Sequence, residues 1–96
     1  MCGIFGYVGN DQACDVVKAG LQKLEYRGYD SCGICLQDND GFQIYKAIGD
    51  TSNLDNIQHD GTVGIGHTRW ATHGTVSLKN THPHISSCGN IVNIYI

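Results

Sequence analysis

Residues 11–25 carry apolar side chains at the spacing of an α-helix, and this pattern constrains the fold more than any other feature. Asn10 or Asp11 can cap the N-terminus of such a helix. The apolar stripe consists of Ala13, Val16, Val17, Gly20, Leu21 and Leu24. A helix with a single apolar face must bury that face against another layer of structure. We therefore expect a layered domain in which this helix covers a sheet.

The remaining segments supply strands for such a sheet. Residues 4–8, 32–36, 42–48 and 63–67 are rich in β-formers. Residues 38–41 read Asp-Asn-Asp-Gly, and an Asp-Gly pair between two strands is typical of an antiparallel hairpin. A helix combined with antiparallel strands indicates the α+β class. The 96 residues suffice for one small domain.

Composition and charge argue against several classes of function. The formal net charge is −3 and there is no basic run, which argues against nucleic acid as a partner. No apolar stretch approaches the length of about 18 residues that a membrane span needs, so we expect no membrane association. Five cysteines, an odd number, without a signal peptide favour reduced thiols and a cytoplasmic location.

Cys32 and Cys35 have the spacing of a zinc-ligand pair, and His82 and His84 could complete a small zinc-binding module. However, residues three apart in a strand point to opposite faces, which does not suit chelation. Buried structural thiols are the competing interpretation. We expect no metal and no cofactor.

Cys2 is the candidate nucleophile. The initiator methionine is usually removed before a small residue, which would leave a thiol and a free α-amine on the same residue. An α-amine has a pKa of roughly 7.7–8, so it can act as a base near neutral pH. A thiol with an adjacent base is suited to nucleophilic catalysis.

Two further motifs accompany the Met-Cys-Gly-Ile start: LEYRGYDS at residues 24–31 and GHTRWATHG at residues 66–74. Together the three motifs resemble the glutamine-hydrolysing domain of the glutamine–fructose-6-phosphate aminotransferases (isomerizing). The resemblance runs from residue 1 to about residue 84. Other glutaminases with an N-terminal cysteine share the start but typically lack the Trp-Ala-Thr-His run.

The resemblance implies a fold and a reaction. It implies a four-layer αββα sandwich, the N-terminal nucleophile hydrolase fold, of which residues 1–96 would be an incomplete N-terminal part. The implied reaction is hydrolysis of glutamine through a thioester on Cys2. In the family, a separate C-terminal sugar-isomerase portion uses the ammonia to make glucosamine 6-phosphate from fructose 6-phosphate. We expect homo-oligomers only of the complete protein.

The resemblance also assigns roles to residues after the fourth predicted strand. Arg69 occupies the position that binds the α-carboxylate of glutamine, and a guanidinium suits that group. Thr72 and His73 match positions that line the glutamine pocket. Trp70 matches an indole that closes the ammonia route to water, although a place in the core is equally compatible with the sequence.

Four other residues are candidates for supporting roles. Gly3 would let a substrate approach the backbone. Arg27 could stabilise a thiolate as a nearby cation, or it could form a structural pair with Asp30. His82 and His84 flank a proline, and we expect them to order a loop rather than to catalyse. His82 and His84 therefore remain outside the predicted catalytic set.

The chain departs from the family pattern after residue 84. The family continues into a His-Asn-Gly segment that supplies the oxyanion hole, but neither Asn90 nor Asn93 is followed by glycine. We therefore assign no oxyanion role to either asparagine. Removal of one oxyanion donor typically costs about 10²–10³ in rate. We expect the 96-residue chain alone to be a catalytically inactive fragment, partly unfolded or associated through unpaired strand edges.

Overall fold

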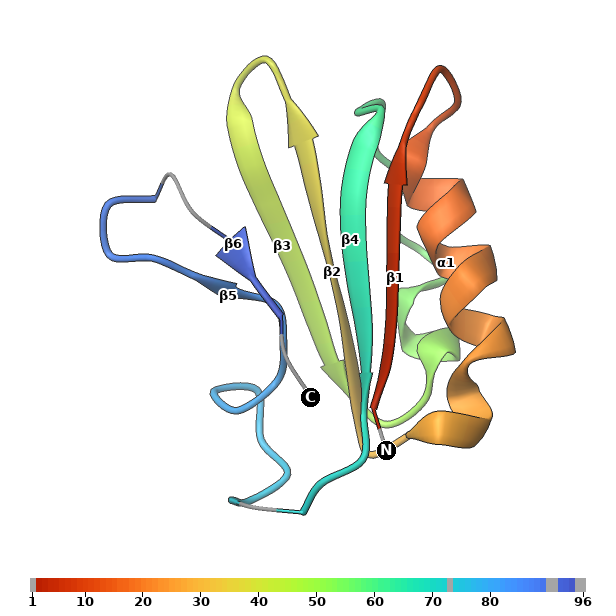
Figure 1. Cartoon of the computed structure of the whole chain (residues 1–96), viewed down its shortest axis with the longest axis vertical. Helices are drawn as coiled ribbons and strands as arrows, with labels where there is room; N and C mark the ends of the chain where they lie inside the picture. The colour runs from red at the N-terminus through yellow and green to blue at the C-terminus, as the bar shows by residue number, and fades with distance from the viewer. Residues whose placement is uncertain (1, 73, 90–91, 95–96) are drawn as a thin grey trace.

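The computed structural model describes residues 2–72, 74–89 and 92–94. The larger sheet has four antiparallel strands: β1 (Gly3–Val8), β2 (Ser31–Asp38), β3 (Gly41–Ile48) and β4 (Val63–Arg69). Their order across the sheet is β1-β4-β2-β3, so β4 lies between β1 and β2 (Figure 1). The α+β prediction is confirmed, and the predicted turn at residues 38–41 joins β2 to β3.

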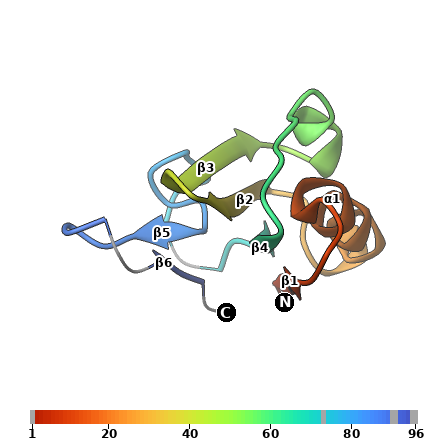
Figure 2. The ribbon, with the colours of Figure 1, turned by 90° about the horizontal axis from the view of Figure 1, so that it is seen from above.

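One α-helix, α1 (Ala13–Lys23), covers one face of this sheet (Figures 1 and 2). It is shorter than the predicted helix because residues 25–27 form a separate 3-10 helix, η1 (Glu25–Arg27). The predicted cap at Asn10 or Asp11 is wrong. Gln12 occupies the N-cap position and its side chain makes no capping hydrogen bond. The start of α1 is instead held by a backbone bond from the Ala13 N–H to the Gly61 carbonyl, 2.8 Å.

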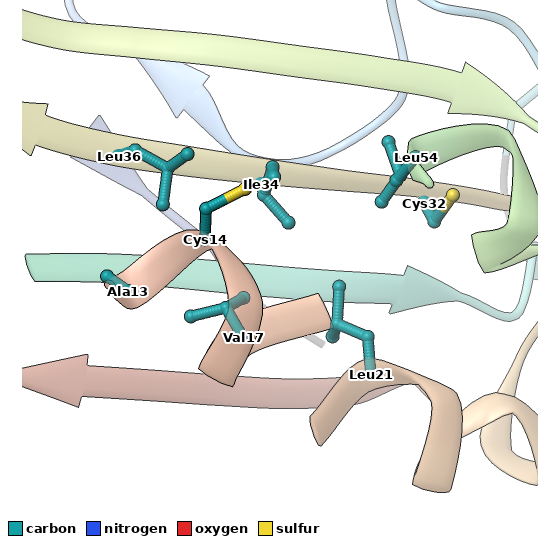
Figure 3. Close-up of a cluster of buried hydrophobic side chains, with 8 residues drawn as sticks. All are labelled: Ala13, Cys14, Val17, Leu21, Cys32, Ile34, Leu36 and Leu54. Atoms are coloured by element: carbon teal, nitrogen blue, oxygen red, sulfur yellow. The ribbon is translucent and has the colours of Figure 1, made fainter. Parts of the chain in front are cut away.

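The core lies between α1 and the sheet (Figure 3). Val17 and Leu21 pack against β4 at Gly66, where a Cβ atom would lie 2.7 Å from the Val17 Cγ1 atom and 2.8 Å from the Leu21 Cδ1 atom. Glycine at this position lets the helix lie close to the strand. The buried cluster consists of Ala13, Cys14, Val17, Leu21, Cys32, Ile34, Leu36 and Leu54. Leu54 comes from a second 3-10 helix, η2 (Thr51–Leu54).

A second, two-stranded sheet of β5 (His84–Ile85) and β6 (Val92–Asn93) follows in the chain. Residues that precede β5 pack on the face of the larger sheet that α1 does not cover. A Cβ atom at Gly33 would collide with the His82 carbonyl, and the His67 and His82 rings stack with centroids 4.3 Å apart. Gly66 faces α1, so the next residue, His67, faces the other way. The described residues therefore form three layers in the order helix, sheet, sheet.

Candidate active site

Cys2 lies where β1 begins and β4 ends, at one end of the larger sheet (Figure 1). The register pairs Gly3 with Thr68, which places Cys2 beside the residues that follow β4. The Trp70 backbone N–H donates a hydrogen bond to the Cys2 Sγ atom at 3.4 Å. The same sulfur lies 3.8 Å from the Trp70 carbonyl oxygen. Cys2 is half-buried, so its thiol is held by backbone groups and still accessible.

Gly3 has a packing role at this place. A Cβ atom on it would lie 2.6 Å from the Thr68 Oγ1 atom and 2.8 Å from the Leu24 Cβ atom. The absence of a side chain therefore lets β1 start directly under the end of α1. Approach of a substrate to this backbone stays a prediction.

Arg27 in η1 contacts Cys2, the candidate nucleophile, through the Cys2 backbone. The Arg27 Nε atom donates to the Cys2 carbonyl oxygen at 3.1 Å. This bond fixes the peptide that follows Cys2, and it adds a positive charge near the thiol. The Asp30 carboxylate, the alternative partner considered for Arg27, accepts a hydrogen bond from the Ala71 N–H at 2.8 Å.

The loop between η1 and β2 packs closely against the end of β4. A Cβ atom at Gly28 would lie 2.5 Å from the carbonyl carbon of Arg69 and 2.6 Å from the Trp70 nitrogen. The Asp30 N–H donates to the Arg69 carbonyl at 3.0 Å. The motifs at residues 24–31 and 66–74, far apart in sequence, are thus in direct contact.

Arg69 is buried, with 7 % of its surface exposed. Its Nη1 atom donates to the Thr75 carbonyl at 2.9 Å, and its Nη2 atom lies 3.5 Å from the Gly74 carbonyl. Asn80 Nδ2 also donates to the Thr75 carbonyl, at 2.9 Å. The Arg69 side chain therefore orders the loop after β4, a role that the sequence did not predict. Its binding of a substrate carboxylate stays a prediction.

Three further predicted pocket residues follow Arg69. Trp70 is 47 % exposed, which excludes it from the core, and its hydrogen bonds with Cys2 are made by its backbone groups. Thr72 is exposed and lies in a bend. His73 lies outside the described residues. The structure thus leaves Trp70 and Thr72 exposed, in the segment whose Trp70 backbone bonds to Cys2.

The His82 ring packs against two other imidazoles: it stacks on His67, on the sheet face opposite α1, and is tilted by 49° to the His84 ring. The His82 and His84 ring centroids lie 4.3 Å apart. Burial, followed by the neighbouring imidazoles His67 and His84 and the cations Arg69 and Lys46, lowers the pKa of His82 to about 4. His82 is therefore neutral at pH 7, and a role of His82 and His84 in ordering the loop stays a prediction.

The buried cysteines do not form the alternative zinc site. Burial raises the pKa of the Cys32 thiol to about 12 and that of Cys35 to about 11, so both are protonated at neutral pH. Cys32 belongs to the core beside α1, and its thiol donates to the Asp50 carbonyl at 3.4 Å. Within residues 2–72, 74–89 and 92–94, no three histidine, cysteine or acidic side chains are grouped as metal ligands would be.

The sequence did not predict two contacts at the candidate site. The Trp70 N–H donates to the Cys2 sulfur, and the Ala71 N–H donates to the Asp30 carboxylate. Asp30 lies two residues before the predicted strand 32–36, and Ala71 lies four residues after the predicted strand 63–67. An antiparallel pairing of those strands would have indicated that the two residues meet. The sequence did not indicate the register of β2 and β4, which places Ser31 opposite Arg69.

Among the described residues, no helix is both long enough and apolar enough to cross a membrane. The one α-helix is 11 residues long.

No protein-family model matches the chain. A glutamine–fructose-6-phosphate aminotransferase (isomerizing) of Staphylococcus epidermidis is 50 % identical over 99 aligned residues, which cover 99 % of this chain and 16 % of the relative. The corresponding Staphylococcus aureus protein is 48 % identical, and the alignment again covers 99 % of this chain and 16 % of the relative. The chain thus spans about one sixth of the length of these relatives.

Among solved structures, a glutamine phosphoribosylpyrophosphate amidotransferase from B. subtilis, complexed with ADP and GMP, has the same fold. The TM-score is 0.72 at 26 % identity, with 91 % of this chain and 19 % of that chain covered. The predicted N-terminal nucleophile fold is confirmed by this likeness, and the zinc-module alternative is not favoured. Over its whole length the chain is therefore related to the N-terminal part of the glutamine–fructose-6-phosphate aminotransferases, and it has the fold of a glutamine amidotransferase of the N-terminal nucleophile type.

Proposed function

We propose that residues 1–96 are the N-terminal part of a glutamine-hydrolysing domain, with Cys2 as the nucleophile. The observation that carries the proposal is the contact between the Cys2 sulfur and the Trp70 N–H, at the meeting point of two sequence motifs. Identity to curated aminotransferases supports the substrate, because that activity appears in their names.

The chemistry follows from the groups on Cys2. Once Met1 is removed, the α-amine takes the proton of the thiol, directly or through a water molecule. The sulfur then attacks the side-chain amide carbon of glutamine, and the carbon–nitrogen bond breaks as the α-ammonium returns a proton to the departing ammonia. Water hydrolyses the γ-glutamyl thioester to glutamate and regenerates the thiol.

Substrate binding is assigned to the loop after β4. Arg69 would hold the α-carboxylate of glutamine, because a planar guanidinium binds a carboxylate through two parallel hydrogen bonds. Thr72 and His73 would line the pocket, and the exposed Trp70 indole would close the ammonia route to water. Gly3 and Arg27 would support the nucleophile, Gly3 by close packing and Arg27 by fixing the Cys2 carbonyl.

The complete protein would use the ammonia in hexosamine synthesis. In this proposal a C-terminal sugar-isomerase portion converts fructose 6-phosphate to glucosamine 6-phosphate, in a homo-oligomeric cytoplasmic enzyme. The proposal rests on the names and lengths of the relatives, of which this chain covers 16 %. No cofactor is required for the hydrolytic step.

The test replaces Cys2 by alanine in the complete protein and measures glutamate release from glutamine. Hydrolysis should be abolished, while synthesis from added ammonia continues, because the sugar portion does not use the thiol. Cys88→Ser is a matched control, since it removes an exposed thiol outside the site. N-terminal sequencing of active protein should begin at Cys2. Glutamate release by the Cys2→Ala variant at the normal rate would contradict the proposal.

A further inference from the structure

Asp30 is anchored at the start of β2 by three groups. Its Oδ2 atom accepts a hydrogen bond from the Ala71 N–H at 2.8 Å. Its own N–H donates to the Arg69 carbonyl at 3.0 Å, and its carbonyl accepts from the Gly49 N–H at 3.0 Å. The two backbone bonds do not depend on the side chain. Among the residues that the structure describes, the carboxylate therefore makes one hydrogen bond of its own, and that bond is with the segment that follows β4.

The segment that Asp30 holds is the one that contacts the nucleophile. β4 lies between β1 and β2, and its pairing with both strands ends at Thr68 and Arg69. Beyond that point no ladder fixes the next two peptide groups. In an extended chain, successive N–H groups point to opposite sides. Here the Trp70 N–H points to Cys2 on the β1 side, and the Ala71 N–H points to Asp30 on the β2 side.

We infer that Asp30 is a positioning residue for Cys2, acting through the Ala71 N–H to aim the Trp70 N–H at the sulfur. This inference rests on the proposed function, because it concerns the nucleophile of that reaction. A hydrogen bond from an N–H to a carboxylate is charge-assisted and stronger than one to a neutral acceptor. It replaces the ladder bonds that the strand lacks after Arg69.

The consequence is expected in the chemical step. A misplacement of about 1 Å in a reacting group can cost roughly 10² in rate. Asp30 bonds to the Arg69 backbone carbonyl through its own N–H, and its carboxylate bonds to the Ala71 N–H. Loss of the Asp30 carboxylate should therefore lower kcat for glutamine hydrolysis and leave KM nearly unchanged.

The experiment compares Asp30→Ala with Asp30→Asn in the complete protein. Asparagine has the same shape and keeps an oxygen that can accept the Ala71 N–H, whereas alanine removes the acceptor. We expect Asp30→Ala to lower kcat by roughly tenfold or more, and Asp30→Asn to retain kcat within about threefold. Iodoacetamide should alkylate Cys2 more slowly in Asp30→Ala, as measured by mass spectrometry of the N-terminal peptide across pH 6–9. Asp40→Ala removes an exposed carboxylate at the far end of the sheet and should change neither readout.

Three results would overturn the inference. The first is a normal kcat and normal alkylation profile in Asp30→Ala. The second is an Asp30→Asn variant that folds but loses kcat by roughly tenfold or more, since an acceptor of the same shape should be sufficient; this result is decisive even if the alanine variant fails to fold. The third is an unchanged kcat with a raised KM. Cys2→Ala, assayed in parallel, distinguishes these outcomes, because glutaminase activity in that variant refutes the proposed function itself.

Discussion

Replacing Arg69 by lysine separates two roles of its guanidinium. In the structure, this buried side chain donates to the Thr75 carbonyl at 2.9 Å and approaches the Gly74 carbonyl at 3.5 Å. Lysine keeps the charge but loses the planar fork that can hold a carboxylate and a loop together. A hydrogen bond to a charged group contributes roughly 1.5–3 kcal/mol. Loss of one such bond to the substrate corresponds to about a 10- to 150-fold weaker interaction.

The assay measures glutamate release from glutamine and amide hydrolysis of an analogue that lacks the α-carboxylate. If Arg69 binds that carboxylate, Arg69→Lys raises the KM for glutamine at least tenfold and leaves kcat/KM for the analogue nearly unchanged. Lys79→Gln removes an exposed cation from the same loop and should change neither value. Normal saturation by glutamine would refute the assignment. An equal loss for both substrates would show that Arg69 acts only by ordering the loop.

The remaining predictions concern stability and thiol chemistry. Leu21→Ala removes a fully buried side chain between α1 and β4 and should lower the free energy of unfolding of the domain by about 2–5 kcal/mol, as measured by urea denaturation. His82 has a folded-state pKa of about 4, below its ordinary value of 6.5, so its neutral form contributes stability above pH 6.5 that is lost as the pH falls towards 4. The urea midpoint should therefore be lower at pH 5 than at pH 7, and this difference in midpoint should be smaller in His82→Asn. Because burial raises the pKa of Cys32 and Cys35, iodoacetamide at pH 7.5 should label Cys88 and leave these two unmodified, by peptide mass spectrometry.

The sequence predicted the helix, the four strands and the hairpin turn because periodicity and turn residues are local signals. It failed where a tertiary contact replaces a local one. The start of α1 is held by the Gly61 carbonyl, a residue 48 positions from Ala13, so no side-chain cap is needed. A capping preference of Asn10 or Asp11 could not reveal this.

The candidate site was predicted as a set of residues but not as an arrangement. Cys2, Arg27 and Arg69 were chosen through motifs, and the structure brings their segments together at one end of the sheet. The motifs did not indicate that Arg69 orders its own loop or that Asp30 holds the Ala71 N–H. Both contacts depend on strand register, which a single sequence leaves undetermined.

The most direct test of Cys2 as the nucleophile is covalent capture. A glutamine analogue whose side-chain amide is replaced by a chloromethyl ketone should alkylate the complete protein on one peptide, identified by mass spectrometry. The account predicts a peptide that begins at Cys2, without Met1, and carries the adduct on the Cys2 sulfur, and it predicts that excess glutamine protects this thiol. The account would be contradicted if Cys2 stayed unmodified while Cys88 or another cysteine carried the adduct, and if excess glutamine prevented that adduct.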